Sequence, residues 1–245
     1  MSKLKKSKLL CEFGGVIMTR YGMAIDLHKC VGCSACSISC KNENNVDVGM
    51  FWSNYKHRTV GQFPNVRYEY IPTLCNHCEN APCVRVCPTG AMYKDENGLT
   101  LNDPDKCIGC KSCMQACPYG VIYFNQEKPQ KYWRDSNQII SDATASGKEM
   151  QEKLGVEIPY YNPDRENTYL GIRPKGIVEK CTLCDHRLKD GLNPYCVDSC
   201  PADARVVGDL DDPDSLINKL LAKYDNKTLL PEKGTKPKVF YLRGY

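Results

Sequence analysis

The stretch Cys30-Val31-Gly32-Cys33-Ser34-Ala35-Cys36-Ser37-Ile38-Ser39-Cys40 decides the fold of this chain. Its spacing is C-x2-C-x2-C-x3-C, the spacing with which bacterial iron–sulfur proteins hold [4Fe–4S] clusters. Three thiolates separated by two residues each can wrap one cluster on a tight loop. The fourth lies about one helical turn further on and faces elsewhere. Gly32 and the small residues that follow it let backbone N–H groups approach the sulfurs.

Three further cysteine quartets follow the first. Their spacings are C-x2-C-x4-C-x3-C, C-x2-C-x2-C-x3-C and C-x2-C-x11-C-x3-C. Each of the three ends in Cys-Pro and then enters a short apolar run, which indicates an internal repeat of a ferredoxin half-unit. Their members are Cys75, Cys78, Cys83 and Cys87; Cys107, Cys110, Cys113 and Cys117; and Cys181, Cys184, Cys196 and Cys200.

The quartets predict two ferredoxin-like modules with two clusters each. In two-cluster ferredoxins the fourth cysteine of a run ligates the other cluster. The second and third quartets are close in sequence and form one module, which leaves the first and fourth to form the other. The predicted ligand sets of the four [4Fe–4S] clusters are Cys30, Cys33, Cys36 and Cys200; Cys40, Cys181, Cys184 and Cys196; Cys75, Cys78, Cys83 and Cys117; and Cys87, Cys107, Cys110 and Cys113.

Composition fits a globular protein with buried metal clusters. The 245 residues are 42% hydrophobic and 25% charged, and the formal charge is +4. This excess is weak evidence for nucleic acid, because each oxidised cluster with four thiolates would contribute about −2. Seventeen cysteines in these spacings favour metal ligation over a disulfide scaffold. Cys11 is left over and is assigned no role.

No segment predicts a membrane span or a secretory signal. No stretch approaches the ~20 apolar residues that a span requires. Residues 1–10 are basic, but the apolar run that follows is interrupted, and there is no twin arginine. Gly14-Gly15 must be encoded by a GGN-GGN sequence that resembles a ribosome-binding site upstream of Met18. Residues 1–17 are therefore interpreted as an extension, with Met18 as the hypothetical natural start.

Other kinds of metal site and reaction centre fit the sequence less well than four [4Fe–4S] clusters. Zinc sites use two CxxC pairs per ion and do not require four cysteines within eleven residues or a Cys-Pro ending. A self-contained redox enzyme would need an iron with an open position, and sixteen cysteines leave none. A Rieske site would need histidines in place of two cysteines, so His77 and His186 are interpreted as non-ligands. Together with Lys180 and Arg187 they could tune cluster potentials. There is no dinucleotide fingerprint, P-loop or nucleophile–base pair.

The predicted fold class is α+β: short strands, hairpins and short helices with long loop insertions. Strands are expected at 21–27, 66–70, 121–124, 205–207 and 237–242, a hairpin at 91–101, a helix at 214–223 and a helical turn at 150–154. Residues 41–49 are expected to form a loop. The expected domains are residues 18–70 with 177–208 as the first module, 71–124 as the second, 125–176 as an insertion, and 209–245 as a C-terminal extension. The insertion is interpreted as a surface for partner docking, with a solvated loop as the alternative. The end of the extension is a candidate for being secured by a partner.

The quartets, in this order and spacing, resemble the iron–sulfur subunits of the dimethyl-sulfoxide-reductase family of molybdenum or tungsten enzymes. The resemblance runs from Met18 almost to the end and includes residues 71–78, 83–92, 179–188 and 238–242. It implies the cluster pairing given above. It also implies a non-catalytic electron-transfer subunit that connects a large molybdopterin-containing catalytic subunit to a quinone-linked membrane subunit or a c-type cytochrome.

Within this family, several segments are similar to the small subunit of respiratory arsenate reductases. These are Trp52-Ser53, Gln62-Phe63-Pro64, the insertion with Trp133, and Arg173-Pro174-Lys175. Subunits of polysulfide, thiosulfate, tetrathionate and dimethyl sulfoxide reductases are the alternatives. The resemblance further implies a role in anaerobic respiration and a periplasmic location, or one on the outer face of the cytoplasmic membrane, reached by export with the large subunit. A cytoplasmic complex is the alternative location.

Overall fold

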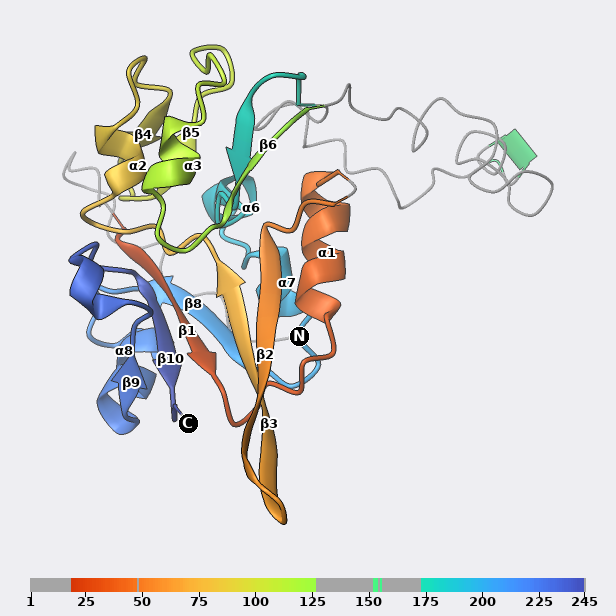
Figure 1. Ribbon diagram of the computed structural model, residues 1–245, viewed down its shortest axis with the longest axis vertical. Coiled ribbons are helices and arrows are strands. Elements are labelled where there is room, and N and C mark those ends of the chain that lie inside the picture. The colour runs from red at the N-terminus through yellow and green to blue at the C-terminus, as the bar shows by residue number, and fades with distance from the viewer. Residues whose placement is uncertain (1–18, 48, 127–151, 154, 156–172, 245) are drawn as a thin grey trace.

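The computed structural model describes residues 19–47, 49–126, 152, 153, 155 and 173–244. Its central element is a four-stranded sheet in the order β8-β1-β10-β9 (Figure 1). Strand β1 (Tyr21–Asp26) pairs antiparallel with β8 (Arg205–Asp209) and parallel with β10 (Val239–Leu242). The two-residue strand β9 (Asn226–Lys227) pairs antiparallel with β10. The predicted strands at 21–27, 205–207 and 237–242 are thus present, although the last begins at Val239.

Strand β1 is buried on both faces, which explains its unbroken apolar run. Met23, Ala24 and Ile25 are at most 1% exposed. Helix α8 (Leu216–Lys223) packs Ile217 against Ala24 on one face, and the main core lies on the other. The Ser215 hydroxyl accepts the Asn218 N–H, so this helix begins later than the predicted position 214.

The C-terminal strand is secured by this chain itself, which corrects the expectation that a partner secures it. Strand β10 is inserted between β1 and β9, and Val239, Tyr241 and Leu242 are buried. The Tyr241 hydroxyl donates a hydrogen bond of 2.6 Å to the Pro72 carbonyl. The short 3-10 helix Pro231–Lys233 precedes this strand.

The expected loop at 41–49 is wrong for its first part, because helix α1 spans Ala35–Asn44. The polar residues that suggested a loop are buried here by tertiary contacts. Glu43 is 6% exposed and pairs with His186, and Asn44 is 8% exposed. Helix α1 packs beside α7 (Tyr195–Asp198), so the end of the first quartet lies against the fourth quartet.

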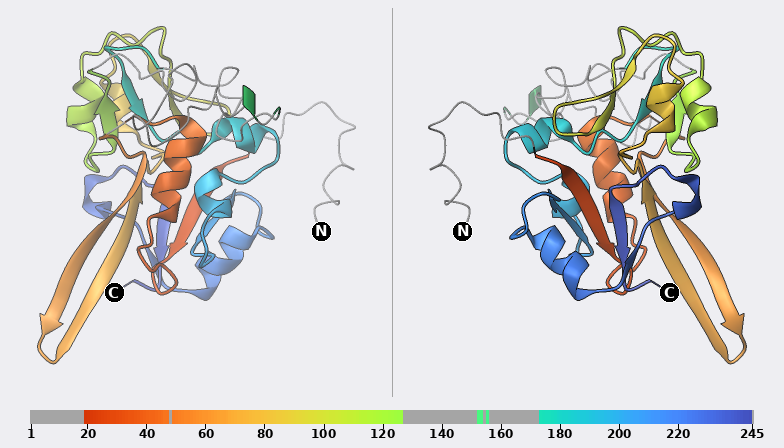
Figure 2. Two further views of the ribbon diagram at one scale, coloured as in Figure 1. Left: turned by 90° about the vertical axis from the view of Figure 1, so that its right-hand side faces the viewer. Right: turned by 90° about the vertical axis from the view of Figure 1, so that its left-hand side faces the viewer.

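Strands β2 (Ser53–Gln62) and β3 (Asn65–Leu74) form a long antiparallel hairpin that contains the predicted strand at 66–70. Its far end projects from the body of the molecule (Figure 2). Tyr55, His57, Tyr68 and Tyr70 form a row of ring contacts along it, with centroids 5.1–6.3 Å apart. The base of the hairpin is buried against the core through Ser53 and Leu74.

The second and third quartets lie at the other end of the molecule (Figure 1). Helix α2 (Pro82–Arg85) and helix α3 (Ser112–Ala116) flank the predicted hairpin, formed by β4 (Met92–Lys94) and β5 (Thr100–Asn102). Strand β6 (Ile122–Phe124) lies where a strand is predicted.

Strand β6 pairs with β7 (Val178–Lys180), a strand that no sequence pattern predicts. Helix α6 (Asp185–Lys189) follows β7. This pairing joins a segment assigned to the first module to one assigned to the second. Most of the insertion at 125–176 lies outside the described residues, as do positions 150, 151 and 154 of the predicted turn. Among the helices of the described residues, none has the length and apolar character needed to cross a lipid bilayer.

Candidate iron–sulfur sites

The four cysteine loops share one backbone feature that the sequence does not reveal directly. The residue before the second cysteine has a positive φ in every quartet: Gly32 at 66°, His77 at 42°, Gly109 at 68° and Leu183 at 60°. A left-handed residue turns the chain sharply between the two cysteines. It also brings a backbone donor to a sulfur, as where the Leu183 N–H lies 3.3 Å from Cys181 Sγ. The four cysteine loops therefore repeat in backbone conformation as well as in sequence.

Site I is the pocket lined by Cys30, Cys33, Cys36 and Cys200. The first three come from the loop before α1 and its first turn, and Cys200 follows α7. The Ala204 N–H lies 3.4 Å from Cys200 Sγ. Cys33 is exposed, so this site reaches the surface. Tyr55, Pro72 and Arg205 are also in the lining.

Site II brings together Cys40, Cys181, Cys184 and Cys196, all of them buried. The Asn44 side-chain amide lies 3.6 Å from Cys40 Sγ and 3.7 Å from Cys184 Sγ. Burial and then the neighbouring thiols raise the pKa of Cys40 well above its usual value, and that of Cys181 to about 12. Such a set ionises readily only beside strong positive charge, as bound metal provides.

Site III is the pocket lined by Cys75, Cys78, Cys83 and Cys117. Burial, with Cys75 the next cause, raises the pKa of Cys83 to about 12. The Tyr119 hydroxyl bonds the Thr235 hydroxyl at 2.5 Å beside this pocket. Lys180 also lines it.

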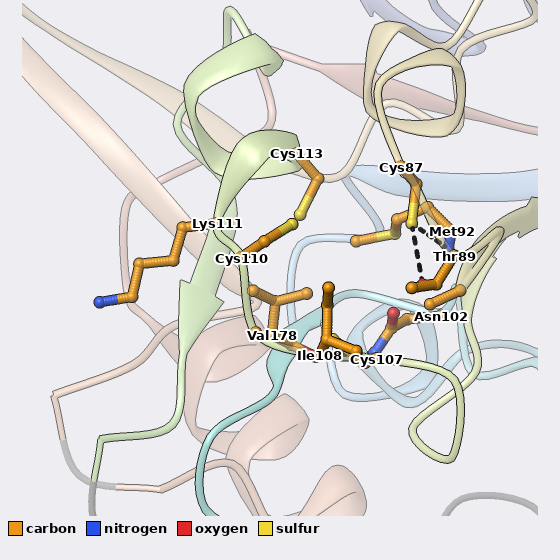
Figure 3. A pocket seen from close by; sticks show the side chains of 12 residues that line it. Cys87, Thr89, Met92, Asn102, Cys107, Ile108, Cys110, Lys111, Cys113 and Val178 are labelled. Carbon is orange, nitrogen blue, oxygen red and sulfur yellow. Dashed lines mark hydrogen bonds between the residues drawn. The ribbon is translucent and has the colours of Figure 1, made fainter.

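Site IV is the pocket lined by Cys87, Cys107, Cys110 and Cys113 (Figure 3). The Met92 N–H lies 3.4 Å from Cys87 Sγ. The Ser112 hydroxyl lies 3.5 Å from Cys110 Sγ, and this hydrogen bond lowers the pKa of the exposed Cys110 thiol. Sites I and IV thus each present one cysteine at the surface, whereas sites II and III are enclosed.

The four donor sets fit clusters better than single ions. All sixteen cysteines of the described residues are free thiols. No three His, Cys, Asp or Glu side chains among those residues converge closely enough to hold one metal ion. Four thiols spread around a pocket, with backbone N–H groups directed at the sulfurs, match a [4Fe–4S] cluster. Cys11 lies outside the described residues.

The two histidines near the cysteines have other partners. His77 is 2% exposed, and its Nδ1 accepts the Thr100 N–H at 3.1 Å. Burial first, and then the neighbouring Lys180, Lys238 and Lys94, lower the pKa of His77 well below its usual value, so the imidazole is neutral.

His186 lies on α6, and its Nε2 is 2.8 Å from Glu43 Oε1. Arg187 bonds Asp198 at 2.8 Å and lies 3.7 Å from Glu43. These two residues therefore fix the helices around site II.

The sequence patterns do not reveal the roles of two buried residues, Arg205 and Glu179. Arg205 was assigned only to a strand, yet it is 4% exposed and lines site I. An arginine within an apolar strand directly after the last Cys-Pro was the available signal. Glu179 is 1% exposed and joins three segments through Trp52, Asn125 and Arg173. No periodicity marks such a residue, because its partners are distant in sequence.

The chain matches models of 4Fe-4S dicluster domains at residues 29–91, 66–136 and 131–210. It is 55% identical to the arsenate respiratory reductase iron-sulfur subunit ArrB of Shewanella sp. (strain ANA-3), over 92% of this chain and 97% of that protein. It is 41% identical to a protein of Halobacterium salinarum that is named as a dimethyl sulfoxide reductase iron-sulfur subunit, over 93% and 80%. The thiosulfate reductase electron transfer subunit PhsB of Salmonella typhi is 34% identical over 80% and 79%.

These relatives are iron–sulfur or electron-transfer subunits of reductases, and their names mark them as distinct from the catalytic subunits. The dicluster matches give the fold as two ferredoxin-like domains of mixed α and β content, and they indicate [4Fe–4S] clusters as the cofactor. The predicted resemblance is confirmed by the extent of identity. The chain belongs to the iron–sulfur electron-transfer subunits of the dimethyl-sulfoxide-reductase family of enzyme complexes.

Proposed function

We propose that this protein is a four-cluster relay that carries single electrons to or from the catalytic subunit of a respiratory arsenate reductase. The observation that carries the relay is the presence of four free cysteines around each of sites I, III and IV, and four more in site II. The arsenate assignment is supported by 55% identity to ArrB over nearly the full length of both chains.

The proposed ligand sets are the members of the four sites. Sites I and II share residues of the first and fourth quartets, and sites III and IV share residues of the second and third. Each quartet thus contributes one cysteine to its neighbour's site, namely Cys40, Cys87, Cys117 and Cys200.

Residues of this chain would hold the clusters, bury them and stabilise their negative charge. When bound, a [4Fe–4S] cluster accepts and returns one electron at a time. The thiolates hold it, and backbone donors such as the Leu183 N–H stabilise negative charge on the sulfurs. All four cysteines of site II and three of the four in site III are buried. The surface cysteines Cys33 and Cys110 mark the two places where partners can approach within electron-transfer range.

Partners and location follow from the same proposal. Electrons would pass between a large molybdopterin-containing subunit and a quinone-linked membrane subunit or a c-type cytochrome. The complex would lie in the periplasm or on the outer face of the cytoplasmic membrane, after export with the large subunit. The second candidate function is the same relay in a tetrathionate, thiosulfate or dimethyl sulfoxide reductase, which identities of 34–41% to subunits of such enzymes support.

Metal analysis and a ligand substitution test the relay. Anaerobically prepared protein should contain about sixteen irons per chain. The Cys200→Ser change should damage the site I cluster and leave the Cys181 site loaded, as resolved by EPR. Cys11→Ser is the matched control, because Cys11 is in none of the predicted ligand sets, and it should retain all four signals. Zinc in place of iron, or loss of the site II signal alone in Cys200→Ser, would refute the proposal.

The arsenate assignment is tested on the assembled complex. The chain should co-purify with the large subunit from its native operon, and this complex should reduce arsenate with a low-potential dye as donor. Tetrathionate, thiosulfate and dimethyl sulfoxide are tested in parallel. Turnover of one of these, with none of arsenate, would transfer the assignment to that substrate and leave the relay intact.

A further inference from the structure

Two buried cations lie at the boundaries between neighbouring cysteine sites. Arg205 is 4% exposed and Lys180 is 1% exposed. Neither forms an ion pair with a carboxylate in the part of the chain that the structure describes. A buried charge without a counter-charge is strongly unfavourable, because the interior solvates it poorly. The fold therefore calls for negative charge beside both side chains.

Arg205 faces sites I and II together. Its Nη1 donates to Ser53 Oγ at 3.0 Å, and its buried Nη2 has no hydrogen-bond partner in the described residues. The side chain lines the site I pocket with Cys36 and Cys200. The side chain also forms a hydrogen bond with Cys196 of site II and interacts electrostatically with Cys36 of site I. The Arg205 guanidinium thus lies close to thiols of two different sites.

Lys180 occupies the corresponding position between sites II and III. It is the last residue of β7 and directly precedes Cys181, a member of site II. Its Nζ donates to the Cys181 carbonyl at 3.0 Å and also to the Thr100 carbonyl. The same side chain lines the site III pocket. Both of its hydrogen-bond acceptors are neutral, so its charge has no counter-charge of its own.

Site IV differs from the other three. Its pocket includes Lys111, but that residue is exposed, and its side chain extends away from the cysteines (Figure 3). The Lys111 ammonium lies 4.0 Å from the centroid of the Phe124 ring. Water screens such a surface charge far more than a buried one. Site IV thus has no buried cation in its pocket lining.

We propose that the positive charge of Arg205 raises the reduction potentials of the clusters in sites I and II. Lys180 has the same effect on the clusters in sites II and III. The inference rests on the proposed four-cluster function. A thiolate-ligated cluster would carry about −2 when oxidised and −3 after gaining one electron from its neighbour, which loses one. A fixed buried cation stabilises the more negative state more. The two side chains therefore raise the reduction potentials of sites I to III relative to site IV.

Cluster-resolved redox titrations test this assignment. The full-length holoprotein is titrated anaerobically and followed by EPR, with each signal assigned by one Cys→Ser variant per site. Arg205→Met should lower the midpoint potentials of sites I and II and leave III and IV unchanged. Lys180→Met should lower those of sites II and III and leave I and IV unchanged. Lys111→Met is the matched control and should shift none of the four.

Conservative variants separate charge from packing. Arg205→Lys and Lys180→Arg keep the charge and should restore most of each shift. If Arg205→Met loses iron, retention of iron and near-native potentials by Arg205→Lys still supports the charge role. Equal shifts at all four sites, no shift at any site, or the same shift in Arg205→Lys as in Arg205→Met would overturn the inference. Wild-type protein without clusters at sites I to III would overturn the proposed function with it, whereas the other outcomes concern the cations alone.

Discussion

The indole Nε1 of Trp52 donates a hydrogen bond of 3.0 Å to the carboxylate of Glu179, 127 residues further along the chain. The same carboxylate accepts from Asn125 Nδ2 at 3.0 Å and from Arg173 Nε. Arg173 also lies over the Trp52 ring, with 4.7 Å from its guanidinium carbon to the ring centroid. This buried group joins the segment before β2, the end of β6 and strand β7, so it ties the two ends of the molecule together.

Replacement of Glu179 by Ala should destabilise the protein by about 3–5 kcal/mol, because it removes the carboxylate from a buried ion pair with Arg173. In anaerobic thermal scans the apparent melting temperature should fall by roughly 10 °C. Trp52→Phe keeps the ring but loses one hydrogen bond, and about 1 kcal/mol is expected. Glu96→Ala, at an exposed position in the β4–β5 turn, is the control and should have no effect. Equal melting temperatures for Glu179→Ala and this control would contradict the prediction.

Replacement of Gly32 by Ala should remove the site I cluster. Gly32 has a φ of 66°, and an added Cβ would lie 2.2 Å from the Tyr70 ring. Gly191→Ala is a matched control, because Gly191 also has a positive φ but open space around it, and it should cost only about 1 kcal/mol. Iron analysis should show a loss of about a quarter of the iron for Gly32→Ala only.

A second substitution separates the clash from the backbone strain. Tyr70→Ala removes the ring that the new Cβ would meet, so Gly32→Ala/Tyr70→Ala should regain much of the site I signal. If the double variant is as depleted as the single one, the strain at position 32 is the cause and the clash is not.

Removal of residues 238–245 should prevent folding of the sheet. The deletion exposes β1 along one edge and removes the buried side chains of Val239, Tyr241 and Leu242. Each contributes about 1.5–3 kcal/mol, and the sum is comparable to the whole stability of a typical domain. The expected result is insoluble or cluster-free protein. A chain that lacks only residues 244 and 245 is the control and should load iron normally; soluble, iron-loaded protein from the longer deletion would sink the prediction.

Removal of iron should unfold much of the protein. Eight of the buried core residues are cysteines of the four sites, so the core packs around these sites: Cys40, Cys75, Cys78, Cys83, Cys113, Cys181, Cys184 and Cys196. Without the clusters, buried Arg205 and Lys180 would also lose their counter-charges. After treatment with a chelator and an oxidant under denaturant-free conditions, followed by reduction, far-UV circular dichroism should decrease sharply. A retained native spectrum in iron-free protein would show that the polypeptide packing alone holds the fold.

Local sequence patterns predicted the parts of the fold that contain the repeated cysteine quartets and a clear turn signal. The quartet spacings and their proximity in sequence predicted four sets of cysteines, and Asp95 to Gly98 predicted the β4–β5 hairpin. Alternation predicted β1, and the apolar run after the last Cys-Pro predicted β8. Prediction failed where polar side chains are buried by distant partners: helix α1 continues to Asn44 because Glu43 meets His186, 143 residues away. Strand β7 was missed because its three residues form a strand only by pairing with β6.

The sequence by itself determined the cofactor class, the electron-transfer role and the family, because sixteen thiols at fixed spacings have few other uses. Only the tertiary structure decided how the ends of the chain meet. Strand β10 lies beside β1 because sheet pairing and core burial are long-range interactions that no local pattern encodes. The structure also placed the Arg205 guanidinium beside two sites, since the position of a buried charge depends on what the whole fold packs around it.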